Sequence, residues 1–347
     1  NLPKIERENK ARNKFYMIPL IIGLIGLIYT LFKEEKTFWV IMVLFITAGL
    51  LQIVYQNEPP IEPRERDYAI AGSFLTFTFW IGFGVIAIIE FLKKRLPEIP
   101  SAVFAILLCA SAPALMGMQG WNDHTRNGRY TARDFAICYL QSCAPNAVLF
   151  TQGDNDTYPL WYAQEVEGVR PDIRIINLSL LGVDWYIDQL NYKINDADPL
   201  KLSFKPDQYE GSTRDATYYR SDPRIPDGAA LPLKKVMQFI ASDDPRDKVQ
   251  VRQSGETENY LPTKNFYLDI DTNKVKQLNM VEPDEFSQVV TRMQWSIDNN
   301  VLLKNDLMTL DIVANNIMDR PIYFAVSVSP DAYVGLAKYF QLEGLTY

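Results

Sequence analysis

The chain is poor in the residues that build common catalytic and metal centres. Among 347 residues it has one histidine, His124, and three cysteines, so a zinc site with several histidine ligands is excluded. The P-loop, GxGxxG, GxSxG and HExxH motifs do not occur, which leaves the usual nucleotide-binding, hydrolase and zinc-protease classes without support. The net charge of -7 and the pI of about 5.0 argue against nucleic acid as a partner, because nucleic-acid-binding surfaces are basic.

The three cysteines form no metal-binding pattern. Cys109 lies in a hydrophobic run, whereas Cys138 and Cys143 are five positions apart, on an expected helix and at its end. In an oxidising compartment this pair could form a disulfide. Two free, half-buried thiols are the interpretation that we favour.

Hydropathy divides the chain into two unlike parts. Residues 15–118 consist mainly of Ile, Leu, Phe, Val, Gly and Ala, whereas residues 119–347 carry most acidic groups and turn signals, a contrast that the mean hydropathy of -0.11 conceals. Residues 1–14 form a charged loop without the pattern of a secretory signal peptide. We expect the chain to be a piece of a longer protein that extends beyond both ends.

Four stretches of the first part are apolar enough to cross a membrane, which takes about 20 residues. Aromatic residues gather near their ends, as expected at a membrane interface. Buried helices of a soluble protein are the alternative, but they would have to be apolar on every side. The four predicted spans are 15–32, 37–55, 68–92 and 101–118.

Four crossings place residues 1–14, the loop 56–67 and the soluble part on one face of the membrane. Lys and Arg number seven on that face up to residue 67 and five on the other face, so the positive-inside rule decides little.

The loop 56–67 reads QNEPPIEPRERD and ends in four charges beside the next span. Charges at that depth usually pair or meet a polar ligand. One interpretation is a solvated loop with internal Arg–Glu pairs. The other is a site for a phosphate-bearing lipid donor, since Arg suits a bidentate contact with phosphate. The candidates for that site are Arg64, Glu65, Arg66 and Asp67.

The second part alternates short apolar strands with helices, which indicates a parallel sheet with helices packed on it. We therefore predict a membrane α-helical part with four spans and a soluble α/β domain, 119–347, with a mostly parallel sheet. A long insertion, 196–298, is expected to hold one helix, 233–241, and one or two strands near 265–270. The predicted strands are 147–151, 172–178 and 321–326, followed by helices over 157–167, through 185–189 and over 330–340.

The first predicted strand runs into the string TQGDNDTYPLWY. In a structural interpretation Gly153 makes a tight turn, Asp156 or Thr157 caps the helix, and Pro159 lies in its first turn. In a functional interpretation the polar string binds sugar hydroxyls, a stacked sugar ring or a divalent cation, where a parallel sheet presents its ligand site. Asp-x-Asp alone is weak support for a metal, and we assign no metal ligand. The binding candidates are Asp154, Asn155, Asp156 and Trp161.

A second polar patch, WNDHTRNGR at 121–129, follows the fourth predicted span at the membrane surface. It is either an ordered polar linker or a site in which cations meet a phosphate and an acid orients one of them. The candidates are Asp123, His124, Arg126 and Arg129.

Four strings together resemble one family. It is a large family of multispan membrane proteins, common in Bacteroidetes, of formerly unknown function and related to transmembrane protein O-mannosyltransferases. The resemblance runs over nearly the whole chain. The strings are PRERDY at 63–68, WNDHTRNGRYTARDFA at 121–136, LFTQGDNDTYPLWYAQEVEGVRPDIRIINLSLL at 149–181 and RPIYFAVS at 320–327.

The resemblance implies a GT-C-type glycosyltransferase of the inner (cytoplasmic) membrane whose soluble domain faces the periplasm. Such an enzyme transfers a sugar, here mannose, from a polyprenyl-phosphate donor to Ser or Thr of a protein acceptor. Its catalytic acid lies in a loop after an early span, and the resemblance places that loop upstream of this chain, so no catalytic residue is assigned. The alternative is a non-catalytic scaffold, or a glycan- or partner-binding membrane protein, in a cell-envelope complex.

Overall fold

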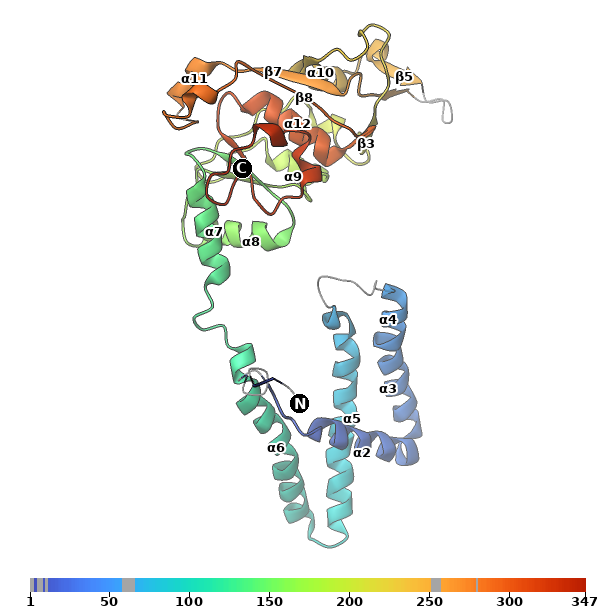
Figure 1. Ribbon diagram of the computed structural model, residues 1–347. Coiled ribbons are helices and arrows are strands. Elements are labelled where there is room, and N and C mark those ends of the chain that lie inside the picture. Colours follow the sequence, from blue (N-terminus) through green and yellow to red (C-terminus); the bar gives the residue numbers. More distant parts are fainter. Residues whose placement is uncertain (1–2, 5–8, 10–11, 58–65, 251–256, 279) are drawn as a thin grey trace. The chain divides into compact units, whose positions relative to one another are not determined.

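A computed structural model of the protein describes residues 3–4, 9, 12–57, 66–250, 257–278 and 280–347. The chain divides into two units, Asn1–Gly128 and Arg129–Tyr347, and each is treated by itself. Figure 1 labels their helices and strands along the chain.

The first unit is helical, and α3, α5 and α6 appear in it as long, roughly parallel rods (Figure 1). A kink at Gly49 separates α3 from α4 within one apolar stretch. The elements of this unit are α2 (Ile18–Lys33), α3 (Glu35–Ala48), α4 (Leu50–Gln56), η1 (Asp67–Ile70), α5 (Ala71–Lys93) and α6 (Glu98–His124).

Three helical stretches of the described chain are long and apolar enough to cross a membrane: Glu35–Gln56, Tyr68–Lys93 and Glu98–His124. They confirm three of the four predicted spans. The remaining one, α2, is helical over 16 residues. That length corresponds to about 24 Å, short of the roughly 30 Å of membrane hydrocarbon. The count of four spans therefore stays a prediction.

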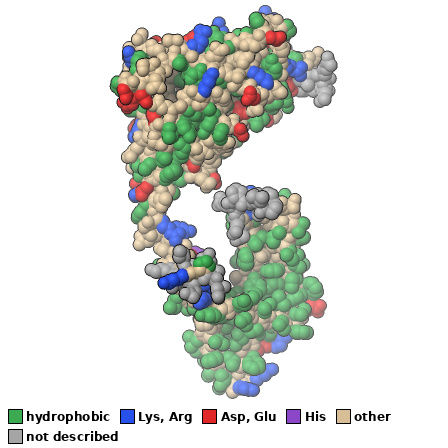
Figure 2. Space-filling view, in the orientation of Figure 1, with side chains coloured by type: hydrophobic (Ala, Val, Ile, Leu, Met, Phe, Trp, Pro, Cys, Tyr) green, Lys and Arg blue, Asp and Glu red, His purple; other side chains and the backbone are tan. Residues whose placement is uncertain are grey.

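Large apolar side chains cover the outside of these helices (Figure 2). Leu50, Val54 and Leu107, for example, are exposed by more than half. The hydroxyl groups of Thr76 and Ser111 donate to carbonyls of their own helices, so they need no water. A surface of this kind is stable in lipid, and the protein is therefore membrane-embedded.

Helices α2 and α5 pack through glycine. A Cβ atom at Gly26 would lie 1.8 Å from the carbonyl oxygen of Trp80, and one at Gly84 would lie 2.1 Å from that of Ile22. Small residues let the backbones of membrane helices approach closely, where packing replaces the hydrophobic effect. Beside this contact the indole of Trp80 is 1% exposed and packs against Phe77.

The second unit is built around a three-stranded parallel sheet in the order β10-β1-β2. Every residue of β1 and β2 is buried, as the apolar runs in the sequence predict. The three predicted strands and the helix through 185–189 are thus confirmed. The elements are α7 (Thr131–Ser142), β1 (Val148–Thr151), α8 (Asp154–Glu165), β2 (Arg174–Asn177), α9 (Asp184–Gln189) and β10 (Ile322–Phe324).

The other sheets correct the prediction of a mostly parallel domain. One is a mixed sheet in the order β4-β7-β8, and two are antiparallel pairs, β3-β9 and β5-β6. The predicted helix and strand of the insertion are present as α10 and β7. The elements of this region are η2 (Pro206–Gln208), β3 (Ala216–Tyr218), β4 (Leu231–Pro232), α10 (Leu233–Ile240), η3 (Pro245–Asp247), β5 (Lys248–Gln250), β6 (Thr257–Asn259), β7 (Asn265–Asp269), α11 (Thr272–Gln277), η4 (Phe286–Gln288), β8 (Arg292–Ser296) and β9 (Val301–Leu303).

The predicted helix over 330–340 is wrong. The chain there forms two short turns, η5 (Pro330–Tyr333) and η6 (Ala337–Tyr339). Val334 and Gly335 between them have φ angles of 45° and 83°, in the left-handed region that ends a helix. The sequence prediction also omitted α12 (Lys304–Asn316), which is largely buried.

The structure agrees with the prediction that Cys138 and Cys143 are free thiols. Cys138 lies on α7 and Cys143 follows its end, and both are free, with Cys143 buried and Cys138 exposed. Burial raises the pKa of the Cys143 thiol to about 12, so it stays protonated at neutral pH.

Candidate functional site

The three parallel strands end at one edge of the sheet, and the polar residues that follow them meet there. β1 ends at Thr151, β2 at Asn177 and β10 at Phe324. Ligands of parallel sheets bind outside this edge. Residues 151–156, 177–179 and 325–329 are called the carboxyl edge below.

Gly153 turns the chain from β1 into α8. Its φ of 80° and ψ of -176° lie in a region that only glycine adopts readily. Its carbonyl accepts hydrogen bonds from Thr157 Oγ1 at 2.6 Å and Asn177 Nδ2 at 3.1 Å, and Thr157 Oγ1 lies 2.7 Å from Thr151 Oγ1. These three polar side chains are buried, so the network fixes the turn to both strands.

The helix after the turn begins earlier than the sequence suggested. α8 runs over Asp154–Glu165, and Gly153 occupies its N-cap position. The expected cap by Asp156 or Thr157 is therefore wrong. Asp154 and Asp156 lie instead in the first turn, where acidic groups interact favourably with the helix dipole.

Two hydrogen-bonded contacts connect the GDND turn to the segment after β10. Ser327 Oγ donates to the carboxylate of Asp156, and the Tyr139 hydroxyl donates to Ser327 Oγ at 3.4 Å. The backbone N–H of Ser329 donates to Gln152 Oε1 at 2.7 Å. Burial raises the pKa of Tyr139, which keeps its hydroxyl protonated as a donor. The Asp156 carboxylate is thus already engaged by Ser327 within the domain.

Asp154 and Asn155 are exposed on the carboxyl edge, as are Gln152, Ser179 and Ser327. Within the described residues neither the Asp154 nor the Asn155 side chain forms a hydrogen bond, so both can accept hydrogen bonds from a hydroxyl-bearing ligand. A divalent cation has less support. The described part of the chain contains no group of three or more His, Cys, Asp or Glu side chains placed to hold a metal ion.

Replacing Gly153 with Ala is expected to lower the free energy of unfolding by about 2 kcal/mol. A Cβ atom here would meet no atom within 4 Å, so the cost comes from the backbone conformation alone. Urea unfolding of the purified protein measures it. Gly182→Ala is the matched control, because its Cβ would also meet nothing within 4 Å and its backbone has no positive φ. Equal losses in the two variants would contradict the expectation.

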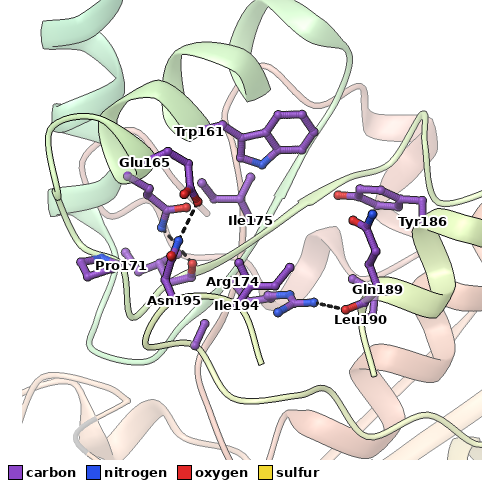
Figure 3. A pocket seen from close by; sticks show the side chains of 13 residues that line it. Trp161, Glu165, Pro171, Arg174, Ile175, Tyr186, Gln189, Leu190, Ile194 and Asn195 are labelled. Carbon is purple, nitrogen blue, oxygen red and sulfur yellow. Dashed lines mark hydrogen bonds between the residues drawn. The ribbon is translucent and has the colours of Figure 1, made fainter. Parts of the chain in front are cut away.

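Trp161 lies in a different place, in a cavity of about 290 Å³ beside β2 (Figure 3). None of the three residues 154–156 lines this cavity. Its wall is mostly apolar and includes a few amide and charged side chains. The lining residues are Trp161, Gln164, Glu165, Pro171, Ile173, Arg174, Ile175, Tyr186, Gln189, Leu190, Ile194, Asn195 and Ala197.

Two cavity residues that the sequence analysis did not single out link the cavity to the sheet. The buried Arg174 donates to the carbonyl oxygens of Tyr192 at 3.0 Å and Gln189 at 2.6 Å. Burial lowers the pKa of Arg174 to about 10, so it remains charged at neutral pH. The hydroxyl of Tyr186 accepts a hydrogen bond of 2.9 Å from the backbone N–H of Asn177. A lone arginine in the apolar string DIRIINL was the signal available in the sequence.

The candidates near the membrane are partly described. Arg64 and Glu65 lie outside the described residues, Arg66 is exposed, and Asp67 opens η1. Their contact with a lipid phosphate stays a prediction.

At the end of α6, Asp123 and His124 lie in the last helical turn. Arg126 Nη1 donates to the backbone carbonyl of Asp123 at 3.1 Å, while the Asp123 carboxylate accepts from Asn13 Nδ2 at 2.6 Å. The carboxylate therefore contacts an amide and not Arg126. Arg129 begins the second unit.

Comparison with known proteins gives a family match. Residues 132–347 match the family model described as TMEM260-associated domain 2, which covers well over half of the chain. No curated protein and no solved structure shows a significant match. The chain therefore belongs to the family defined by TMEM260-associated domain 2.

Proposed function

We propose that the chain is part of a membrane glycosyltransferase that transfers mannose from a polyprenyl-phosphate donor to Ser or Thr of a protein outside the cytoplasm. The observation that supports this most is the combination in one chain of the TMEM260-associated domain with three helices apolar enough to cross a membrane. Membrane helices can hold a lipid-linked donor, and the second unit offers a surface in water to a protein acceptor.

In this proposal the two units have different tasks. Arginines beside the membrane helices, such as Arg66 and Arg126, hold the phosphate of the donor, since guanidinium binds phosphate bidentately. The carboxyl edge of the second unit accepts hydrogen bonds from the hydroxyl groups of acceptor or sugar through Asp154 and Asn155. The catalytic acid lies elsewhere in the enzyme.

One feature favours a non-catalytic binding protein as the second candidate. At the carboxyl edge, Asp156 is already bonded to Ser327 and Asp154 is exposed, an arrangement that leaves Asp154 accessible to a ligand but offers no buried acid–base pair among the described residues. A scaffold or a glycan-binding protein of a cell-envelope complex would use the same surface.

Replacing Asp154 with Asn is expected to lower the rate of mannose transfer at least about tenfold, a loss of roughly 1.4 kcal/mol in the transition state. Asn keeps the size and the turn preference of Asp but loses the charge. The measurement uses radiolabelled polyprenyl-phosphate mannose, an acceptor peptide with Ser and Thr, and the purified protein.

Asp284→Asn serves as the control, because Asp284 is exposed and lies outside the carboxyl edge. A wild-type transfer rate in Asp154→Asn with an unchanged melting temperature would remove Asp154 from the site. Failure of the wild-type protein to transfer mannose would favour the binding protein instead.

A further inference from the structure

Strand β2 lies at the edge of the parallel sheet, with β1 on one side and no strand on its outer side among the described residues. The backbone N–H of Arg174 donates to Ala147 O, and that of Leu178 donates to Thr151 O, both at 2.8 Å. Backbone groups of alternate residues in a strand point to opposite sides. The even-numbered residues of β2 therefore pair with β1, and residues 173, 175 and 177 direct their N–H and C=O groups to the outer side.

Side chains of the protein satisfy the two ends of this outer edge. Gln164 Nε2 donates to the carbonyl of Ile173 at 2.9 Å, and the N–H of Asn177 donates to the Tyr186 hydroxyl at 2.9 Å. Between them, the N–H and C=O of Ile175 have no hydrogen-bond partner among the described residues. Ile175 is 6% exposed, and buried backbone groups are nearly always paired.

Ile175, whose backbone N–H and C=O are unpaired, lines the cavity beside β2. Figure 3 shows Trp161 above Ile175 and Tyr186 with Gln189 at the far end. The cavity volume of about 290 Å³ is far more than one water molecule needs. Its apolar wall also suits a hydrophobic side chain better than a chain of waters.

We propose that an extended polypeptide segment docks on the outer edge of β2, with one residue paired to Ile175 and an apolar side chain in the cavity against Trp161. In this strand-addition mode the backbone supplies hydrogen bonds and the pocket supplies selectivity. The Ile175 N–H donates to a carbonyl of the segment, and the Ile175 carbonyl accepts from its N–H. The site is short because Gln164 and Tyr186 occupy the neighbouring positions.

The test is fluorescence polarisation with the full chain in lipid nanodiscs. The probes are fluorescein-labelled eight-residue peptides in which Ser alternates with Leu, Val, Ile or Phe, and the same peptides N-methylated at every apolar residue. We expect saturable binding of at least one unmethylated peptide and at least tenfold weaker binding of its methylated form. The assay contains no sugar donor, so its result is independent of the proposed mannose transfer.

Two variants locate the site. Ile175→Pro removes the outward N–H but no hydrogen bond to β1, and Trp161→Ala removes the apolar wall. Each is expected to weaken peptide binding at least tenfold, and Trp161→Ala keeps the test decisive if the proline variant does not fold. Trp185→Ala, an exposed tryptophan that does not line the cavity, should bind as the wild type does. Absence of saturable binding, equal binding of methylated peptides, or unchanged binding by Trp161→Ala would overturn the proposal.

Discussion

Alanine at Gly84 is expected to lower the free energy of unfolding of the first unit by about 3 kcal/mol, whereas alanine at Gly82 on the same helix should change it little. A Cβ atom at Gly84 would lie 2.1 Å from the backbone oxygen of Ile22. Because that atom is backbone, no side-chain rotation relieves the overlap, and α2 must move away from α5. At Gly82 a Cβ atom would meet nothing within 4 Å.

Unfolding by SDS in mixed micelles, followed by the fluorescence of the tryptophans, measures this difference. Trp80 is a useful reporter because its buried indole packs beside the α2–α5 contact. Gly26→Ala should behave like Gly84→Ala, since its Cβ would lie 1.8 Å from the Trp80 carbonyl oxygen. If Gly82→Ala and Gly84→Ala unfold at the same SDS fraction, α2 does not pack on α5 through these glycines.

The membrane helices show what hydropathy can predict. Length and composition identified the stretches of α3–α4, α5 and α6 correctly, because each apolar run is long enough by itself. The packing of α2 on α5 could not be predicted, since Gly26 and Gly84 are two of several glycines and only the partner helix distinguishes them. Gly82 lies two residues from Gly84 on the same helix, yet a Cβ atom there would meet nothing within 4 Å.

In the soluble domain, too, some features could be predicted from the sequence and others could not. The three buried strands of the parallel sheet were predictable because they are short apolar runs followed by turns. The Gly153 turn was also predictable, but its helix start was not, because the Thr157 and Asn177 side chains that hold it come together only in the fold. The cavity residues Arg174 and Tyr186 act through contacts with distant backbone, which leaves little trace in the sequence.

Helix α12 was not predicted from the sequence. It carries a buried acid, Asp311. Asp311 is 0% exposed; its carboxylate accepts hydrogen bonds of 2.8 Å from the Ser203 N–H and from Asn315 Nδ2. Burial raises the pKa of Asp311 to about 6, although these two hydrogen bonds act in the opposite direction. An acid in the middle of a buried helix breaks the apolar periodicity by which the helix would have been recognised.

The raised pKa of Asp311 predicts a pH dependence of stability with a definite sign. An unfolded aspartate has a pKa of about 3.9, so between about pH 4 and pH 6 the folded state binds more protons than the unfolded state. The contribution of this group to stability therefore falls as the pH rises through that window, and it falls by about 3 kcal/mol in total.

Asp311→Asn isolates the effect, because asparagine is neutral at every pH and nearly the same size. The stability of the wild type relative to this variant should be about 2 kcal/mol lower at pH 7 than at pH 4 in urea unfolding, because part of the total change lies below pH 4. Asp222→Asn is the control of opposite sign. Hydrogen bonds from Arg224 lower the pKa of Asp222 to about 2, so the wild type should gain on that variant between about pH 2 and pH 4, and their difference should stay nearly constant from about pH 4 to pH 7. A constant difference between wild type and Asp311→Asn from pH 4 to pH 7 would mean that burial does not raise the pKa of Asp311 above that of an unfolded aspartate.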